Sequence, residues 1–148
     1  ETFYQIVRKL AKKSNKTDQL SCNILGPASL GFRHRDDIIE IKKILNDMGI
    51  DINLIAPMGA SPEDIQVKTA KAHFNVMLYP EVAETTCRYL EKEFNQPYTK
   101  TIPIGIGATK EFIKEISDIF GLKTDNHYNE RLRADWWSKS IDSTIFYR

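Results

Sequence analysis

Strand-type and helix-type segments alternate along residues 21–121, and this alternation limits the folds open to the chain. Short β-branched runs such as SCNILG (21–26) and IDINLIAP (50–57) are each followed by a stretch with apolar residues at helical spacing. Strand–helix–strand connections of this length favour parallel strands covered on both faces. The pattern therefore predicts an α/β fold, a Rossmann-like parallel sheet with helices on both faces.

Four strands are expected in this sheet. The predicted strands are 21–26, 50–57, 73–80 and 97–105. In open parallel sheets, ligands bind beyond the carboxyl ends of the strands. The loops that follow the strands are therefore the first place to look for a site. They are 26–36, 57–62, 79–81 and 103–109.

The predicted helices carry start and stop signals. Asp36 or Asp37 is expected to cap one helix, and Gly49 fits its C-terminal end. Ser61 and Asp64 have the spacing of a capping box, with Pro62 at the first helical position. Apolar periodicity predicts further helices over 2–13, over 80–94 and in the segment that ends at Gly121.

We expect the chain to be a fragment of a longer protein, because it starts at Glu1 within a predicted helix. Residues 1–19 are predicted to be the end of a preceding domain and residues 20–122 the Rossmann-like domain. Residues 123–148 break the alternation and form a predicted tail that leads to an absent further domain.

Composition excludes several classes of function. Lys and Arg number 21 against 20 Asp and Glu, so no basic excess points to nucleic acid. No apolar run approaches the roughly 20 residues of a membrane span. With only two cysteines, Cys22 and Cys87, the chain cannot by itself supply four thiolates to zinc or an iron–sulfur cluster. The two thiols are expected to be buried and inert.

The histidines and serines of the chain form no motif of a catalytic or metal site. His34, His73 and His127 lie far apart in the sequence without HExxH spacing, and no GxSxG elbow is present. GIGATKEF (105–112) follows a predicted strand and opens a helix, where backbone N–H groups could hold a phosphate. It lacks the third glycine of GxGxxG, and the favoured interpretation is a tight strand-to-helix turn.

Two charged segments have competing interpretations. GPASLGFRHRDD (26–37) is either an anion-binding or partner-docking loop or, as favoured here, a solvated loop before a helix. In ADWWSKSIDST (134–144), Asp142 by itself is typical of a turn or a helix cap. An aspartate of ordinary pKa is protonated in only about one molecule in a thousand at pH 7. An apolar surface of Trp136 and Trp137 that excludes water would raise the pKa of Asp142 and make it a proton donor.

Four stretches in order resemble the B-subunit family of light-independent (dark-operative) protochlorophyllide reductases, which are nitrogenase-like. They are NILGPASLGFRHRDD (23–37), INLIAPMGASPEDI (52–65), FNVMLYPEVAETTCRYLEKEFNQPYTKTIPIG (74–105) and WWSKSIDS (136–143). The resemblance implies a fragment of a three-domain subunit with a fold like nitrogenase component 1. Where the family commonly reads GFHN, this chain reads GFRH (31–34), so no family role is carried over to His34.

The resemblance implies an oxidoreductase of chlorophyll biosynthesis that reduces ring D (C17=C18) of protochlorophyllide to chlorophyllide. Electrons would come from ferredoxin through a separate ATP-binding L reductase component. N and B subunits would form a heterotetramer with a shared [4Fe-4S] cluster. Three N-subunit cysteines and one B-subunit aspartate preceding residue 1 would ligate that cluster. The fragment alone would be inactive.

The resemblance also implies a role for one residue and a location. Asp142 matches the aspartate of the family stretch W-[WFY]-S-[RK]-[ST]-[VI]-D, which suggests that it donates a proton to the reduced ring. The chain is rich in lysine and isoleucine, as proteins of AT-rich plastid genomes often are, and the chloroplast stroma is the expected location. The alternative is a non-catalytic Rossmann-like scaffold or another nitrogenase-family component.

Overall fold

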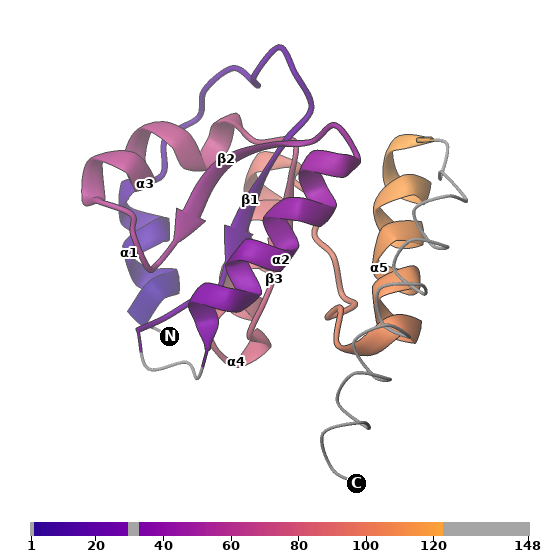
Figure 1. The fold of residues 1–148 in the computed structure, drawn as a ribbon. Coiled ribbons are helices and arrows are strands. Elements are labelled where there is room, and N and C mark those ends of the chain that lie inside the picture. The colour runs from indigo at the N-terminus through magenta and orange to yellow at the C-terminus, as the bar shows by residue number, and fades with distance from the viewer. Residues whose placement is uncertain (1, 30–32, 123–148) are drawn as a thin grey trace, which may run out of the picture. The chain divides into compact units, whose positions relative to one another are not determined.

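The computed structural model describes residues 2–29 and 33–122 of the chain (Figure 1). Contacts divide the chain into two units, residues 1–99 and residues 100–148. The strands of the described sheet all lie in the first unit. The domain boundaries predicted after residues 19 and 122 stay a prediction.

The sheet is parallel, as predicted. Its strands are β1 (Ser21–Leu25), β2 (Asp51–Ala56) and β3 (Phe74–Met77), and they lie in the order β2-β1-β3. The register of β1 against β2 shifts between Cys22 and Asn23, which marks a bulge. The Rossmann-like α/β prediction is thereby confirmed.

The predicted fourth strand over residues 97–105 is wrong. Within this range, all of it described, a single parallel bridge forms, between Asn75 and Tyr98. Asn75 donates its N–H to the Pro97 carbonyl (2.9 Å) and accepts from the Thr99 N–H (3.0 Å). The next donor, the Met77 N–H, bonds to the Thr99 hydroxyl (3.2 Å) instead of a backbone carbonyl, so the ladder stops.

The α-helices form where apolar periodicity and helix-start signals predict them, and one 3₁₀ helix that was not predicted follows the third of them. They are α1 (Thr2–Leu10), α2 (His34–Asp47), α3 (Pro62–Lys68), the short 3₁₀ helix η1 (Thr69–Lys71), α4 (Pro80–Phe94) and α5 (Gly105–Phe120). α1 ends three residues before the predicted end at residue 13. The predicted capping box of α3 is confirmed, because Ser61 and Asp64 exchange backbone-to-side-chain bonds of 3.1 Å each.

The predicted cap of α2 is wrong. Arg33, with φ 55°, occupies the N-cap position, and its side chain makes no capping hydrogen bond. Asp36 and Asp37 lie in the first turn instead, where their carboxylates stabilise the helix through its dipole. The predicted C-terminal end is confirmed. Met48 is the C-cap residue of α2, and Gly49 directly after it has φ 72°.

Helices cover both faces of the sheet. α1, α3 and α4 share one apolar core with the strands. Its members are Phe3, Val7, Leu25, Leu54, Ala56, Ile65, Met77, Ala83, Cys87 and Leu90. α2 contacts β2, and its buried residues Ile38, Ile41 and Leu45 lie outside that core cluster. Figure 1 shows α2 in front of the strands, so its apolar face covers the other side of the sheet.

A network of buried amide side chains crosses the sheet. Asn23 Nδ2 donates to Asn75 Oδ1 (2.9 Å) and to the Thr69 carbonyl (3.0 Å). Asn53 Nδ2 donates to Asn23 Oδ1 (2.6 Å), and Asn75 Nδ2 donates to Gln96 Oε1 (3.4 Å). Asn23, Asn75 and Gln96 are each 0% exposed, so every one of these groups depends on its partner in the protein.

Replacing Asn75 with leucine should cost the full-length protein about 2–4 kcal/mol of stability, because Asn23 and Gln96 lose a partner that water cannot replace. The midpoint of thermal unfolding measures the loss. Asn46→Leu, on an exposed position of α2, is the matched control and should leave the midpoint nearly unchanged. Equal midpoints for the two variants would contradict this role of the network.

Candidate functional site

The strands β1 and β3 end in close contact with each other. Gly26 follows β1 with φ 118°, and a Cβ built on it would lie 1.6 Å from the Leu78 carbonyl oxygen. Its N–H donates to the Ala56 carbonyl (2.9 Å) at the end of β2. Only glycine allows this approach. After β1 the chain crosses through α2 to β2, whereas β3 lies on the other side of β1. Sheets of this kind bind ligands where the strand order reverses in this way.

Tyr79 joins the end of β3 to α2. It has φ 56°, an uncommon backbone conformation for a residue other than glycine. Its hydroxyl donates a hydrogen bond to the Asp37 carboxylate. Burial, followed by this bond, raises the pKa of Tyr79 to about 12. At neutral pH the phenol therefore remains a hydrogen-bond donor beside the carboxyl ends of the strands.

Before and at the start of α2, the charged residues Arg33, Arg35, Asp36 and Asp37 are exposed, whereas Gly26 and Pro27 are buried. Arg33 Nε pairs with Asp36 Oδ2 at 2.8 Å, and the two side chains are 69% and 56% exposed. A pair this exposed contributes little to stability. This part of the loop fits the favoured interpretation. Residues 30–32 lie outside the described residues.

The GIGATKEF segment opens α5, as predicted. Ile104 is the N-cap, and Gly105 takes φ 79° at the first helical residue. The Thr109 hydroxyl donates to the Gly105 carbonyl at 2.8 Å. These are the contacts of a tight entry into a helix. The predicted helix start is confirmed, but the strand predicted before it does not form.

Both cysteines are buried, free thiols, as predicted. Cys22 lies on β1 and Cys87 on α4, and each is 0% exposed. Burial raises the pKa of both thiols, that of Cys87 to about 12. Within residues 2–29 and 33–122 no group of three or more Cys, His, Asp or Glu side chains could hold a metal.

The buried thiols should resist alkylation in the folded full-length protein. With a pKa near 12, about one Cys87 thiol in 10⁴ is ionised at pH 8, and alkylation requires the thiolate. Iodoacetamide followed by peptide mass spectrometry should find Cys22 and Cys87 unlabelled before denaturation and labelled after it. Labelling of either native thiol at the rate of a free cysteine would contradict the structural role.

His73 has a structural role next to β1. Its Nδ1 accepts the Ser21 N–H at 3.2 Å. His34 is the first residue of α2. His127, Trp136, Trp137 and the predicted proton donor Asp142 lie outside the described residues.

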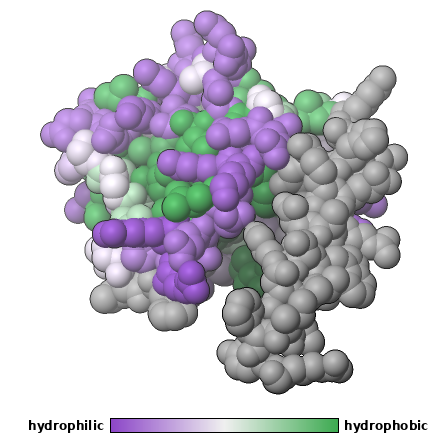
Figure 2. All heavy atoms as spheres, in the orientation of Figure 1, coloured by the Kyte–Doolittle hydropathy of each residue, from purple (hydrophilic) through white to green (hydrophobic). Residues whose placement is uncertain are grey.

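A groove that no sequence pattern pointed to runs along the outer edge of β2. Its volume is about 450 Å³, and its walls come from α2 and α3. It is lined by Arg35, Ile38, Ile39, Lys42, Asn53, Leu54, Ile55, Met58, Gly59, Asp64 and Lys68. Figure 2 shows hydrophobic residues gathered on this face with hydrophilic residues around them. One feature of the sequence could have indicated this groove. Arg35 and Lys42, seven residues apart, lie on either side of Ile39 along the same helix.

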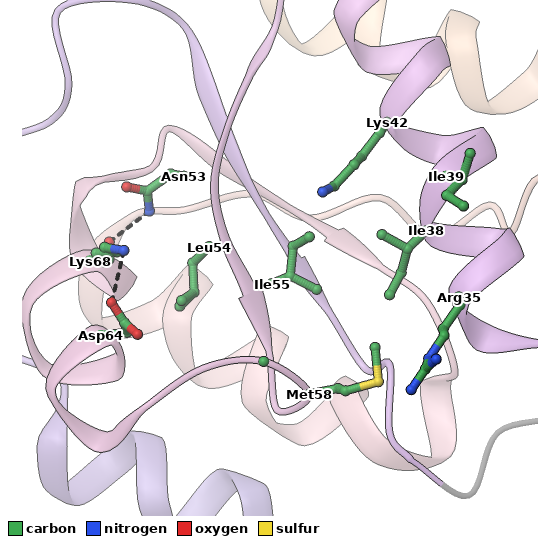
Figure 3. A pocket seen from close by; sticks show the side chains of 11 residues that line it. Arg35, Ile38, Ile39, Lys42, Asn53, Leu54, Ile55, Met58, Asp64 and Lys68 are labelled. Carbon is green, nitrogen blue, oxygen red and sulfur yellow. Dashed lines mark hydrogen bonds and ion pairs between the residues drawn. The ribbon is translucent and has the colours of Figure 1, made fainter.

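The groove has one cationic wall. Figure 3 shows Arg35 and Lys42 on α2 with Ile38 and Ile39 between them, opposite Asp64 and Lys68 of α3. Lys68 Nζ pairs with Asp64 Oδ1 at 2.8 Å, so these two charges offset each other. Asn53 Nδ2 donates to the Lys68 carbonyl at 2.8 Å, and this bond joins β2 to the last residue of α3.

Comparison with known proteins identifies the family. The chain belongs to the family of nitrogenase component 1 type oxidoreductases, whose model matches residues 1–147. It is 58% identical over 97% of its length to the B subunit of the light-independent protochlorophyllide reductase of Dinoroseobacter shibae, and 57% identical, also over 97%, to that of Cereibacter sphaeroides. The resemblance predicted from the four sequence stretches is confirmed.

The fold comparison agrees with the family. A solved structure titled "Nitrogenase Cp1 at pH 5" matches 94% of the chain with a TM-score of 0.70 at 20% identity, and the match covers 28% of that protein. The chain spans 27% of the length of each of the two bacterial relatives. In the part of the chain that the structure describes, no helix is long and apolar enough to cross a membrane.

Proposed function

We propose that this chain is part of the catalytic component of a light-independent protochlorophyllide reductase. That enzyme reduces the C17=C18 bond of ring D of protochlorophyllide to give chlorophyllide. The observation that carries the proposal is the 58% identity over 97% of the chain to a protein of that name. The nitrogenase-type family and fold are shared with other activities, so they support the proposal only at the level of an oxidoreductase.

The described residues do not fit a [4Fe-4S] site. Cys22 and Cys87 are buried protonated thiols, and one lies on a strand while the other lies on a helix. A cluster needs deprotonated ligands that converge on one point. The resemblance to the B-subunit family implies instead that three cysteines of the N subunit and one aspartate of the B subunit hold the cluster. ATP is assigned to the separate L component.

Asp142 is proposed as the proton donor to ring D. Reduction of a carbon–carbon double bond adds two electrons and two protons, and one of these protons would come from the Asp142 carboxylic acid. Trp136 and Trp137, which lie in the same stretch of the sequence, would raise the pKa of Asp142 by excluding water from it. This raised pKa would keep a fraction of the acid protonated at neutral pH.

The proposed assembly is a heterotetramer of two N and two B subunits, served by the L component with electrons from ferredoxin. The named relatives are bacterial, and the proposed location in the chloroplast stroma is supported only by the lysine- and isoleucine-rich composition. Recovery of the gene on a plastid genome, next to a gene for an N-type subunit, would test both points. A nuclear or bacterial locus would contradict the location.

A reconstitution experiment tests the activity. The full-length protein is assembled with an N-type subunit and the L component, and protochlorophyllide is followed by absorbance in the dark. ATP-dependent formation of chlorophyllide is expected. If the assembled complex carries its cluster yet leaves protochlorophyllide unreduced, the chain belongs to a scaffold or to another nitrogenase-type component instead.

A further inference from the structure

The groove beside β2 lies at an open edge of the sheet. β2 ends the strand order in the described part of the chain, and β1 is its neighbour there. α2 forms one wall of the groove and α3 the other, although these helices cover opposite faces of the sheet. A groove with one wall from each face must follow the edge itself, as Figure 3 shows for Leu54 and Ile55 between the two helices.

The backbone of β2 offers hydrogen-bonding groups to this groove. The Ala56 carbonyl accepts the N–H of Gly26, which places the backbone groups of Ala56 on the side of β1. In a parallel strand the groups of successive residues point to alternate sides, so the N–H and C=O of Ile55 point outward. An open edge of this kind is a template for one more strand.

The charges and apolar surface of the groove select its occupant. Among the described residues neither Arg35 nor Lys42 forms an ion pair, whereas Lys68 is held by Asp64. Ile39 lies between these two cations and is 50% exposed. A small anion would leave the apolar floor in water. A second copy paired antiparallel along this edge would bring Arg35 and Lys42 against their own equivalents.

We propose that the groove binds an extended polypeptide segment that pairs with the outer edge of β2. Its backbone bonds to Ile55, its apolar side chains cover Ile38 and Ile39, and its carboxylates lie against Arg35 and Lys42. This is strand addition, in which the backbone supplies affinity and the alternating side chains supply specificity. The inference rests on the groove alone and does not depend on the proposed reaction.

Photo-crosslinking in the assembled full-length complex tests the inference. The crosslinker p-benzoylphenylalanine replaces Ile39 in one variant and Val67 in another. The two residues are matched, because Val67 is 51% exposed and does not line the groove. After irradiation, mass spectrometry should find one acid-bearing segment joined to position 39 and absent from position 67.

Charge reversal gives a second measurement on the same complex. Lys42→Glu should lower the yield of the crosslink at position 39 by about tenfold, because like charges across an interface repel. Lys43→Glu is the control, since Lys43 lies next to Lys42 but pairs with Glu40 at 2.7 Å and does not line the groove. A crosslink to a second copy of this chain, no protein crosslink at position 39, or equal yields in the two charge variants would overturn the inference.

Discussion

Replacement of Asp142 with alanine in the assembled complex is expected to lower the rate of chlorophyllide formation by about 10²- to 10⁴-fold, the usual contribution of a positioned general acid. Protochlorophyllide should still bind, because the substitution removes one carboxyl group and changes no other side chain. Single-turnover absorbance measurements, with bound substrate determined separately, distinguish the loss of proton transfer from the loss of binding.

Two further variants and a pH series sharpen this test. Asp142→Glu keeps a carboxylic acid and should retain more activity than Asp142→Ala, while Ser143→Ala controls for a local change in the same segment. A proton donor works only when protonated, so the wild-type rate should fall as pH rises, and the alanine variant should lose this dependence. Normal reduction by Asp142→Ala with bound substrate would remove Asp142 from the mechanism.

Gly26→Ala, directly after β1, is expected to be strongly destabilising. The added Cβ would lie 1.6 Å from the Leu78 carbonyl oxygen, which belongs to the backbone and cannot turn aside. The backbone would also be strained at φ 118°. Together these effects should cost about 3–5 kcal/mol, much of the stability of an ordinary domain. Soluble yield and the thermal midpoint of the full-length protein measure the loss.

Two other glycines separate the causes of this effect. Gly59 has φ 83° with nothing within 4 Å of a built Cβ, so Gly59→Ala carries backbone strain without a collision and should cost about 1–2 kcal/mol. Gly107, inside α5, has open space and no positive φ, so its replacement by alanine should be neutral or slightly stabilising. If all three alanine variants unfold at the same temperature, the close approach at Gly26 is not the reason for the glycine.

Local signals predicted the helices and the parallel strands well. The capping box at Ser61 and Asp64 could be read from the sequence, because both hydrogen bonds join residues three positions apart. The cap of α2 could not, because its acidic residues suit both the cap position and the first turn. Arg33 in a left-handed conformation is not a choice that sequence statistics would favour.

The prediction of a fourth strand was wrong because of a contact between residues far apart in the sequence. The segment after α4 has the composition of a strand. Its pairing with β3 ends where the Thr99 hydroxyl accepts the hydrogen bond from the Met77 N–H. No pattern within residues 97–105 indicates that bond, since its partner lies on β3. In the candidate site, the sequence named the loops at the carboxyl ends of the strands but not the bond from Tyr79 to Asp37.

The sequence by itself determined the fold class, the family and the proposed proton donor Asp142. Periodicity and caps arise from neighbours along the chain, and the family signal is a matter of residue order. Only the tertiary structure decided where β2 is left open, which cations beside it lack an ion pair among the described residues, and why Gly26 must be glycine. These features depend on contacts between residues far apart in the chain, and such contacts exist only once the sheet and its helices have packed.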